Sequence, residues 1–208
     1  MIFRMMNLRH ITAVLVLCIS ALGASAQSAS QILNSAIKRF DSVCGVTANY
    51  VVANDQGTTK GTIDMLGNKF RIMSDDLKCW YDGKTQWTYS SMSGEVSIII
   101  PTLEEMQMSN PYIALTTLKK SCKVYKAFTQ VEGLYTLKLV PKDNDQIKQI
   151  LVYIHKDSYI VSKVYFEMSD GSYLRTSISN FKAANLPKTT FDYDPKAVPE
   201  GTDVVDLR

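Results

Sequence analysis

The chain has 208 residues, 46% of them hydrophobic, and a formal net charge of +3 with both signs interspersed. This balance argues against a nucleic-acid-binding protein, which would carry a basic patch or stripe, and against strong electrostatic binding to anionic lipid. The length suits a single domain with a substantial core.

The first residues form a predicted export signal. Two arginines precede an apolar run from Ile11 to Leu22, which ends in Ala24-Ser25-Ala26. A basic start, a short apolar core and a small-x-small site are typical of a cleaved secretory signal peptide. The apolar core is too short for a permanent membrane anchor. We therefore expect residues 1–26 to be a signal peptide and residues 27–208 to form a single exported domain.

A helix and a series of short strands follow in chain order. Apolar residues recur at three- and four-residue steps from Ser30 to Val43, which predicts an amphipathic helix with Ser30 as its N-cap. Period-two patterns separated by Gly, Asn and Asp turns then predict strands. About eleven strands are expected, over residues 46–53, 58–66, 70–73, 78–81, 85–90, 95–100, 122–129, 134–140, 147–155, 159–168 and 173–180.

Two short helices are expected to interrupt the strands between Pro101 and Lys120. Thr102 and Glu105 have the spacing of a capping box, and Asn110-Pro111 is a second helix start with Asn as the cap. Closely spaced strands without alternating long helices indicate an antiparallel meander rather than an α/β fold. A sheet of this size tends to curl or close, so the predicted fold class is mainly β, a complete or incomplete antiparallel barrel.

Side chains suited to catalysis are scarce in residues 27–208. The one histidine, His155, lies at a predicted strand end beside a turn, where a solvated side chain is expected. Cys44, Cys79 and Cys122 lack C-x-x-C spacing, so no metal site is expected, and their pairing stays open. We therefore expect no enzyme, and a hydrolase built on His155 is the weakest alternative.

Several predicted strands are apolar on both alternating faces, as in Ile98-Ile99-Ile100 and Val164-Tyr165-Phe166. Such strands are buried on both sides of the sheet. The inner face of a barrel built from them is either a filled core or the lining of a ligand cavity, and the residues alone leave both readings open.

Five motifs, in one order along the chain, resemble the LolA family of periplasmic lipoprotein carriers. The most specific is Tyr81-Asp-Gly-Lys-Thr-Gln-Trp87-Thr-Tyr89, which is similar to that family's D-G-K-x-[LI]-W-x-Y hairpin. The other four are Val46-x-Ala48-x-Tyr50, Asn110-Pro111-Tyr112-Ile113-Ala114-Leu115, Leu137-x-Leu139-Val140-Pro141-Lys142 and Phe191-x-Tyr193-x-Pro195-x-x-Val198.

The resemblance implies an unclosed antiparallel β-barrel with helices as a lid, in a periplasmic monomer that uses no cofactor. The space beneath the lid would shield the acyl chains of lipidated proteins. These would come from an inner-membrane ABC-type lipoprotein release complex and pass to an outer-membrane acceptor. The expected lipid-binding wall comprises Ile63, Met65, Phe70, Ile72, Trp87 and Tyr89. The expected lid comprises Pro111, Tyr112, Ile113, Leu115 and Leu118.

One departure from the family pattern supports an alternative function. The family's lid-latching arginine precedes a proline ahead of the Phe-containing strand, where this chain has Leu66-Gly67-Asn68. Arg71 lies beyond that turn and is not expected to take the role. The alternative is a periplasmic lipid-binding or sensor module on the same fold, with a different ligand.

The aromatic hairpin gives a last, local prediction. Asp82-Gly83 is expected to form its bend, since Asp-Gly is a favoured hairpin signal. Alternation puts Trp87 and Tyr89 on one face of the returning strand, opposite Gln86 and Thr88. We expect both rings to point into the barrel.

Overall fold

The computed structural model describes residues 27–41, 45–103, 105–106 and 110–208. The predicted signal peptide and Cys44 lie outside the described residues. Helix α2 (Ala29–Asp41) precedes the first group of strands, and helix α4 (Pro111–Ser121) precedes the second. The strands are β1 (Val46–Asn54), β2 (Gly57–Leu66), β3 (Lys69–Ser74), β4 (Leu77–Tyr81), β5 (Gln86–Ser90), β6 (Glu95–Ile99), β7 (Cys122–Lys126), β8 (Leu134–Pro141), β9 (Ile147–His155), β10 (Val161–Met168), β11 (Tyr173–Ala183) and β12 (Asp203–Asp206).

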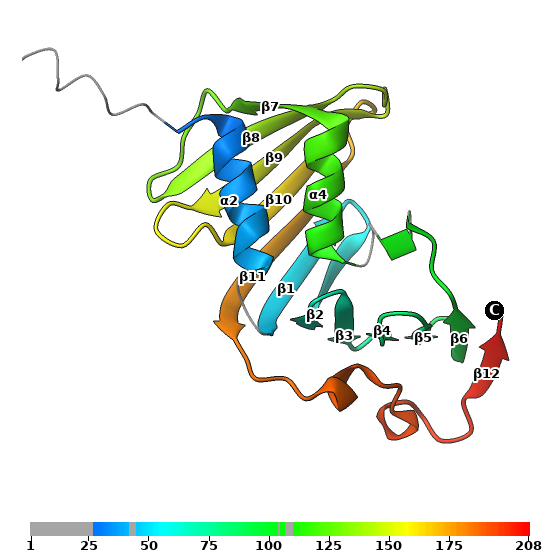
Figure 1. Ribbon diagram of the computed structural model, residues 1–208. Coiled ribbons are helices and arrows are strands. Elements are labelled where there is room, and N and C mark those ends of the chain that lie inside the picture. Colours follow the sequence, from blue (N-terminus) through cyan, green and yellow to red (C-terminus); the bar gives the residue numbers. More distant parts are fainter. Residues whose placement is uncertain (1–26, 42–44, 104, 107–109) are drawn as a thin grey trace, which may run out of the picture.

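The described strands form one twelve-stranded sheet in the order β12-β6-β5-β4-β3-β2-β1-β11-β10-β9-β8-β7. Two antiparallel meanders, β1–β6 and β7–β11, are joined where β11 pairs with β1. Because β12 and β7 are edges that do not pair with each other, the sheet is unclosed, which confirms the predicted fold class. Figure 1 shows α2 and α4 lying side by side over the β7–β11 half, while β2–β6 extend beyond the end of α4.

Helix α2 begins one residue earlier than the sequence pattern predicted, and its cap is a different serine. Ser28 Oγ accepts a hydrogen bond from the backbone N–H of Gln31 at 3.2 Å, and Gln31 Oε1 accepts one from the N–H of Ser28 at 2.7 Å. This reciprocal pair is a capping box, which satisfies two N–H groups that the helix leaves open. The assignment of the cap to Ser30 was therefore wrong.

The predicted caps in the helical insert are confirmed. Thr102 Oγ1 accepts from the N–H of Glu105 at 3.3 Å, and a Glu105 carboxylate oxygen accepts from the N–H of Thr102 at 2.7 Å. The bond from the Thr102 N–H, together with one from the Thr102 hydroxyl at 2.9 Å, lowers the pKa of the Glu105 carboxyl. Asn110 Oδ1 accepts from the N–H of Ile113 at 3.3 Å at the start of α4.

The hairpin between β4 and β5 turns through four residues, Asp82 to Thr85. Asp82 Oδ1 accepts hydrogen bonds from the N–H groups of Lys84 and Thr85, both at 2.8 Å, and Gly83 takes a positive φ of 104°. Asp suits the first position because its carboxylate bonds the backbone two and three residues on, and Gly suits the second because it carries no Cβ. The predicted bend at Asp82-Gly83 is thus confirmed.

A β-bulge in β11 changes which side chains face the helices. The β1–β11 register shifts between Thr47 and Asn49, and Asn180 lies there with a φ of 52°. An extra residue in one strand reverses the alternation beyond it. Phe181 therefore packs against the same cluster as Ile178, three residues earlier in the strand.

The C-terminal segment crosses the sheet face that points away from the helices, through the short 3-10 turns η2 (Lys188–Phe191) and η3 (Pro195–Ala197). Its last strand, β12, pairs in parallel with β6, from Asp203 opposite Glu95 to Asp206 opposite Ile98. This strand was not expected from the sequence. In the described part of the chain, no helix is both long and apolar enough to cross a membrane.

Candidate functional site

The sheet has an inner face, defined here as the face that carries α2 and α4. On the β1–β4 half, cross-strand pairing aligns two rows of side chains on this face. Ile63 of β2 lies opposite Ile72 of β3, and Met65 lies opposite Phe70. The rows continue into β4 as Cys79 and Tyr81. With Ala48, these residues form one buried cluster in which Phe70 is 0% exposed. Apolar residues at period two thus give this half of the sheet an apolar inner face.

The helices bury a second cluster on the other half of the same face. Ile32, Leu33 and Ala36 of α2 and Leu115 of α4 pack against strands β8–β10 through the set Leu137, Leu139, Ile150, Val152, Ile154 and Val161. Full burial of a side chain such as Ile32 or Leu33 stabilises the fold by about 1.5–3 kcal/mol. Ile178 packs against both clusters, so the inner face is apolar without interruption between the two halves.

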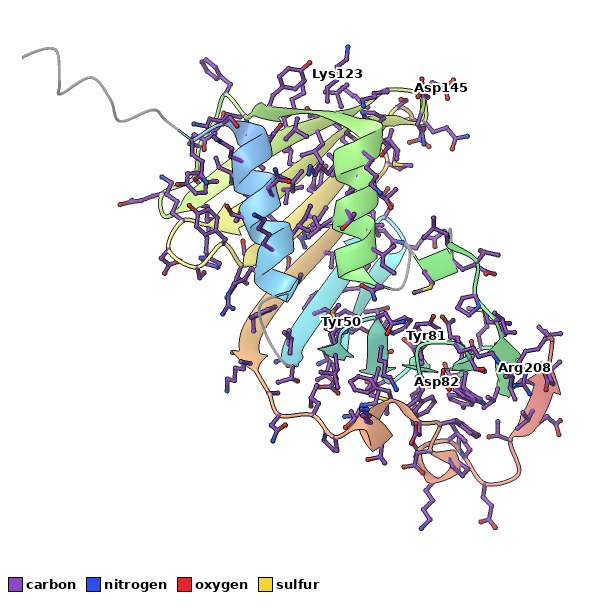
Figure 2. All side chains as sticks on the ribbon, in the orientation of Figure 1. Tyr50, Tyr81, Asp82, Lys123, Asp145 and Arg208 are labelled. Carbon is purple, nitrogen blue, oxygen red and sulfur yellow. The ribbon has the colours of Figure 1, made fainter. Side chains whose placement is uncertain are left out.

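The predicted lid residues lie on α4 as expected from the sequence. Leu115 is 3% exposed and belongs to the helix-covered cluster, Leu118 packs against that cluster, and Ile113 is half-buried. The side chains of Pro111 and Tyr112 lie outside the described residues. Figure 2 shows Tyr50 and Tyr81 below the lower end of α4, on the β1–β4 half that the two helices leave free.

The six predicted wall residues do not lie together. Ile63, Met65, Phe70 and Ile72 share the inner face, whereas Trp87 and Tyr89 belong to a cluster with Trp80, Val96 and Val198 on the outer face. Trp87 pairs with Trp80, and Gln86 pairs with Tyr81, so Gln86 and not Trp87 faces inward. The expectation that both rings point into the barrel is corrected. The C-terminal segment covers this part of the outer face with apolar side chains such as Val198. Trp87 and Tyr89 are therefore shielded from solvent on the outer side of the sheet.

Polar atoms gather where the inner face reaches β5. Gln86 Nε2 donates to Thr88 Oγ1 at 3.1 Å, and the Thr88 hydroxyl lies 3.5 Å from Cys79 Sγ. Among the described residues, buried Gln86 Oε1 has no hydrogen-bond partner. Burial raises the pKa of the Cys79 thiol to about 11, so it stays protonated near neutral pH.

Sequence reasoning missed several residues of this face, namely Ala48, Tyr50, Cys79, Tyr81, Gln86, Ile178 and Phe181. Alternation within β4 groups Cys79 with Tyr81, but it cannot group them with Phe70 of another strand. The register that sets Phe70 opposite Tyr81 was needed to place them on the same face. Their rings lie 5.2 Å apart.

Arg71 lies on the outer face, away from the helices. Its guanidinium holds buried Asp64, with Nη2 at 2.7 Å and Nε at 3.0 Å from Asp64 Oδ2. The pair therefore lies on the side of the sheet opposite the lid helix α4. The pair lies beside an outer groove of about 500 Å³ over β1–β3, lined by Asn49, Tyr50, Val51, Lys60, Gly61, Thr62, Met73, Ser74, Asp75 and Ser179.

Side chains that can carry acid–base chemistry lie apart on the surface. His155 is exposed at the end of β9, Asp75 and Asp76 are exposed between β3 and β4, and Glu105 is held in its capping box. Within the described residues, no three His, Cys, Asp or Glu side chains gather as metal ligands would.

The sequence profile of a family described as "Outer membrane lipoprotein carrier protein LolA" matches residues 19–172. The chain therefore belongs to this family, whose description is that of a carrier rather than an enzyme. No curated protein sequence matches the chain.

Two solved structures share the fold at low sequence identity. An uncharacterized conserved protein from Thermus thermophilus is 15% identical, with a TM-score of 0.57, over 86% of this chain and 98% of that one. A chain of the MucA/MucB complex of Pseudomonas aeruginosa is 11% identical, with a TM-score of 0.52, over 82% of this chain and 62% of that one. These likenesses concern the fold alone.

Proposed function

We propose that the protein is an exported periplasmic carrier that shields the acyl chains of lipoproteins against the inner face of its sheet. The supporting observation is the apolar surface formed by Ile63, Met65, Phe70 and Ile72 on the side that carries the helices. Membership of a family described as a lipoprotein carrier agrees with it. In this proposal residues 27–208 act as one domain after removal of the signal peptide.

The physical requirement on such a carrier is reversible burial of hydrocarbon. Each methylene removed from water contributes about 0.8 kcal/mol, so an acyl chain needs a long apolar surface. The inner face runs from the helix-covered cluster through Ile178 to Phe70 and Tyr81. Movement of α4 away from the sheet would extend that surface by exposing Leu115. Met65, with its flexible side chain, suits chains of variable shape.

The partners follow from this cargo. An inner-membrane ABC-type release complex would load the lipoprotein, and an outer-membrane acceptor would receive it. The four inner-face wall residues and the lid residues of α4 would contact the acyl chains. Trp87 and Tyr89, being on the outer face, would instead hold the C-terminal segment.

The direct test is binding of a diacylated lipoprotein by purified residues 27–208 without detergent, with displacement of a fluorescent acyl-chain probe as the readout. Ile72→Trp adds bulk to a half-buried inner position and should weaken probe binding at least tenfold. Val51→Trp, on the outer face of β1, is the matched control and should bind as the wild type does. Failure of the wild type to form a soluble complex or to bind the probe would refute the carrier function.

Mass spectrometry of the ligand that copurifies with the protein separates the carrier from a lipid-binding or sensor module. A lipopeptide or lipoprotein supports the carrier. A free lipid that excludes lipoprotein from the inner face would favour the other function.

A further inference from the structure

The outer face of β7–β11 is a surface of lysines, arginine and tyrosines that the function above does not use. Cross-strand pairing aligns one row across all five strands, from Tyr125 through Lys138, Leu151 and Tyr165 to Arg175. At about 4.8 Å between neighbouring strands, the row is about 19 Å wide. Helices α2 and α4 pack on the opposite face and do not cover this row.

Cations outnumber carboxylates on this face. On β7–β11, all of whose residues are described, the outward cations include Lys123, Lys138, Lys163 and Arg175, and the outward carboxylate is Glu167. Glu167 is already paired, with its Oε1 2.6 Å from Lys148 Nζ. The acids of this half lie in the connecting loops, at Glu132, Asp143, Asp145, Asp157 and Asp170. The nearly neutral net charge of the chain therefore conceals a basic face.

Tyrosine rings lie among the cations, and one of them contacts a lysine. Lys163 Nζ lies 3.9 Å from the centroid of the Tyr153 ring, within the range of a cation–π contact. Tyr165 and Tyr173 stack with centroids 5.9 Å apart and planes at 18°. The tyrosine rings and the lysine ammonium groups together form a broad surface that is both aromatic and cationic.

Exposed apolar side chains continue this surface at the β7 edge. Tyr125 is 49% exposed, and the β7–β8 connection that begins just after it exposes Phe128 fully and Val131 by 43%. Figure 2 shows Lys123 at this outer edge, far from Tyr50.

We propose that the outer face of β7–β11 docks on an anionic phospholipid surface, with lysines at the headgroups and the aromatic side chains of Tyr125 and Phe128 at the interface. Lys and Arg are attracted to anionic lipid surfaces, and tyrosines favour the headgroup level. An extended acidic peptide would fit less well, because these cations are spread over β7, β8, β10 and β11 rather than gathered along a groove. This docking is independent of what the inner face binds.

Sedimentation with phosphatidylglycerol–phosphatidylethanolamine vesicles tests the proposal, with phosphatidylcholine vesicles for comparison. The wild type should bind the anionic vesicles at least tenfold more tightly, and 0.5 M NaCl should remove most of the difference. The triple variant Lys138→Gln, Lys163→Gln, Arg175→Gln should lose on the order of a hundredfold in affinity, since each basic residue near the surface contributes about fivefold.

The control removes the same charge elsewhere, by Lys84→Gln, Lys188→Gln and Lys196→Gln, at exposed positions outside this face. It should bind anionic vesicles within twofold of the wild type. Phe128→Ser should weaken vesicle binding several-fold without changing the salt dependence, since the charges remain.

Three results would overturn the proposal: no preference for anionic vesicles, equal losses in the two triple variants, or binding of polyglutamate in preference to vesicles. The last would assign the face to an acidic protein. Because acyl-probe binding at the inner face should be unchanged in the Lys138, Lys163, Arg175 variant, failure of surface docking and failure of the carrier function are distinguishable.

Discussion

Trp87 of β5 stacks on Tyr193 of the C-terminal segment, with ring centroids 6.4 Å apart and planes at 7°. Tyr193 also meets Trp80 edge to face, at 5.4 Å and 83°. Lys78 Nζ donates to the carbonyl of Ala197 in the same segment. The segment after Phe191 is therefore attached to the outer face of β4 and β5 by these aromatic contacts and this hydrogen bond. Trp80 and Trp87 of the hairpin thus stabilise the fold by holding the C-terminal segment.

Replacing Tyr193 by Ala should destabilise the protein by about 2 kcal/mol, because two aromatic pairs and partly buried ring area are lost together. Urea unfolding followed by circular dichroism measures the loss. The tryptophan emission should also shift to the red as water reaches the rings of Trp80 and Trp87, which both contact Tyr193. Tyr193→Phe keeps both ring contacts and should stay within about 0.5 kcal/mol of the wild type. An unchanged midpoint for Tyr193→Ala would show that the segment is held by other contacts.

Much of the fold could be predicted from the sequence because its signals are local. Period-two patterns and turn residues located eleven of the described strands, and the caps at Thr102 and Asn110 rest on spacing alone. The cap of α2 was missed because Ser28 and Ser30 are both plausible caps. Only Ser28 has a glutamine three residues on that can return the bond.

The candidate site was predicted only in part because its membership depends on long-range register. Alternation correctly grouped Trp87 with Tyr89, but it does not say which face of the sheet carries the helices. The pairing of Gln86 with Tyr81 places Gln86 on the helix-bearing face. Trp87 and Tyr89 therefore lie on the opposite face, where the C-terminal segment covers them. Strand β12 was missed because Asp203–Asp206 is short and exposed, and it becomes a strand only where β6 offers an edge.

The Asp64–Arg71 pair should show a strong coupling. Asp64 has 7% of its side chain exposed and Arg71 has 35%, so removing the arginine leaves a carboxylate without its partner in a mostly dry position. Arg71→Met should cost about 2 kcal/mol, below the figure for fully buried pairs because Arg71 is partly solvated. Urea unfolding of the single variants and of Asp64→Asn/Arg71→Met completes a double-mutant cycle.

The double variant should be more stable than Arg71→Met alone, since neutral Asn needs no counter-charge. If the two substitutions instead add independently, the pair contributes no coupling. Lys60→Met, which removes an exposed cation from the same outer sheet face on β2, is a control in which Asp64 keeps its guanidinium.

Gly61 should tolerate no side chain. A Cβ at this position would overlap the carbonyl oxygen of Met73 and lie 2.8 Å from Tyr50 Oη. The backbone oxygen cannot move without disturbing the β2–β3 ladder, in which Gly61 pairs with Ser74. Gly61→Ala should therefore destabilise by about 2 kcal/mol, the usual range for overpacking. Thermal unfolding measures it, with Thr58→Ala at an exposed position of the same strand as the control; equal melting temperatures for the two variants would contradict the prediction.

Cys79 should be unreactive in the native protein and should give stability a specific pH dependence. Its thiol is 3% exposed, and burial raises its pKa from 9.0 to about 11. Since the thiolate is the nucleophile, labelling by a disulfide reagent at pH 8 should require unfolding. The raised pKa means that the unfolded state loses its proton first as pH rises. The stabilising effect of the protonated thiol is thus complete below pH 9 and is lost as pH rises toward 11.

The expected loss from this group is about 2 kcal/mol by pH 11. Other groups titrate in the same range, among them Tyr50 and Tyr81, whose pKa values are also raised by burial. The measurement is therefore the difference between wild type and Cys79→Ala in urea unfolding free energy at pH 8, 9, 10 and 11. The wild type should lose more stability than the variant across this range, and parallel pH profiles would mean that the thiol ionises equally in the folded and unfolded chains.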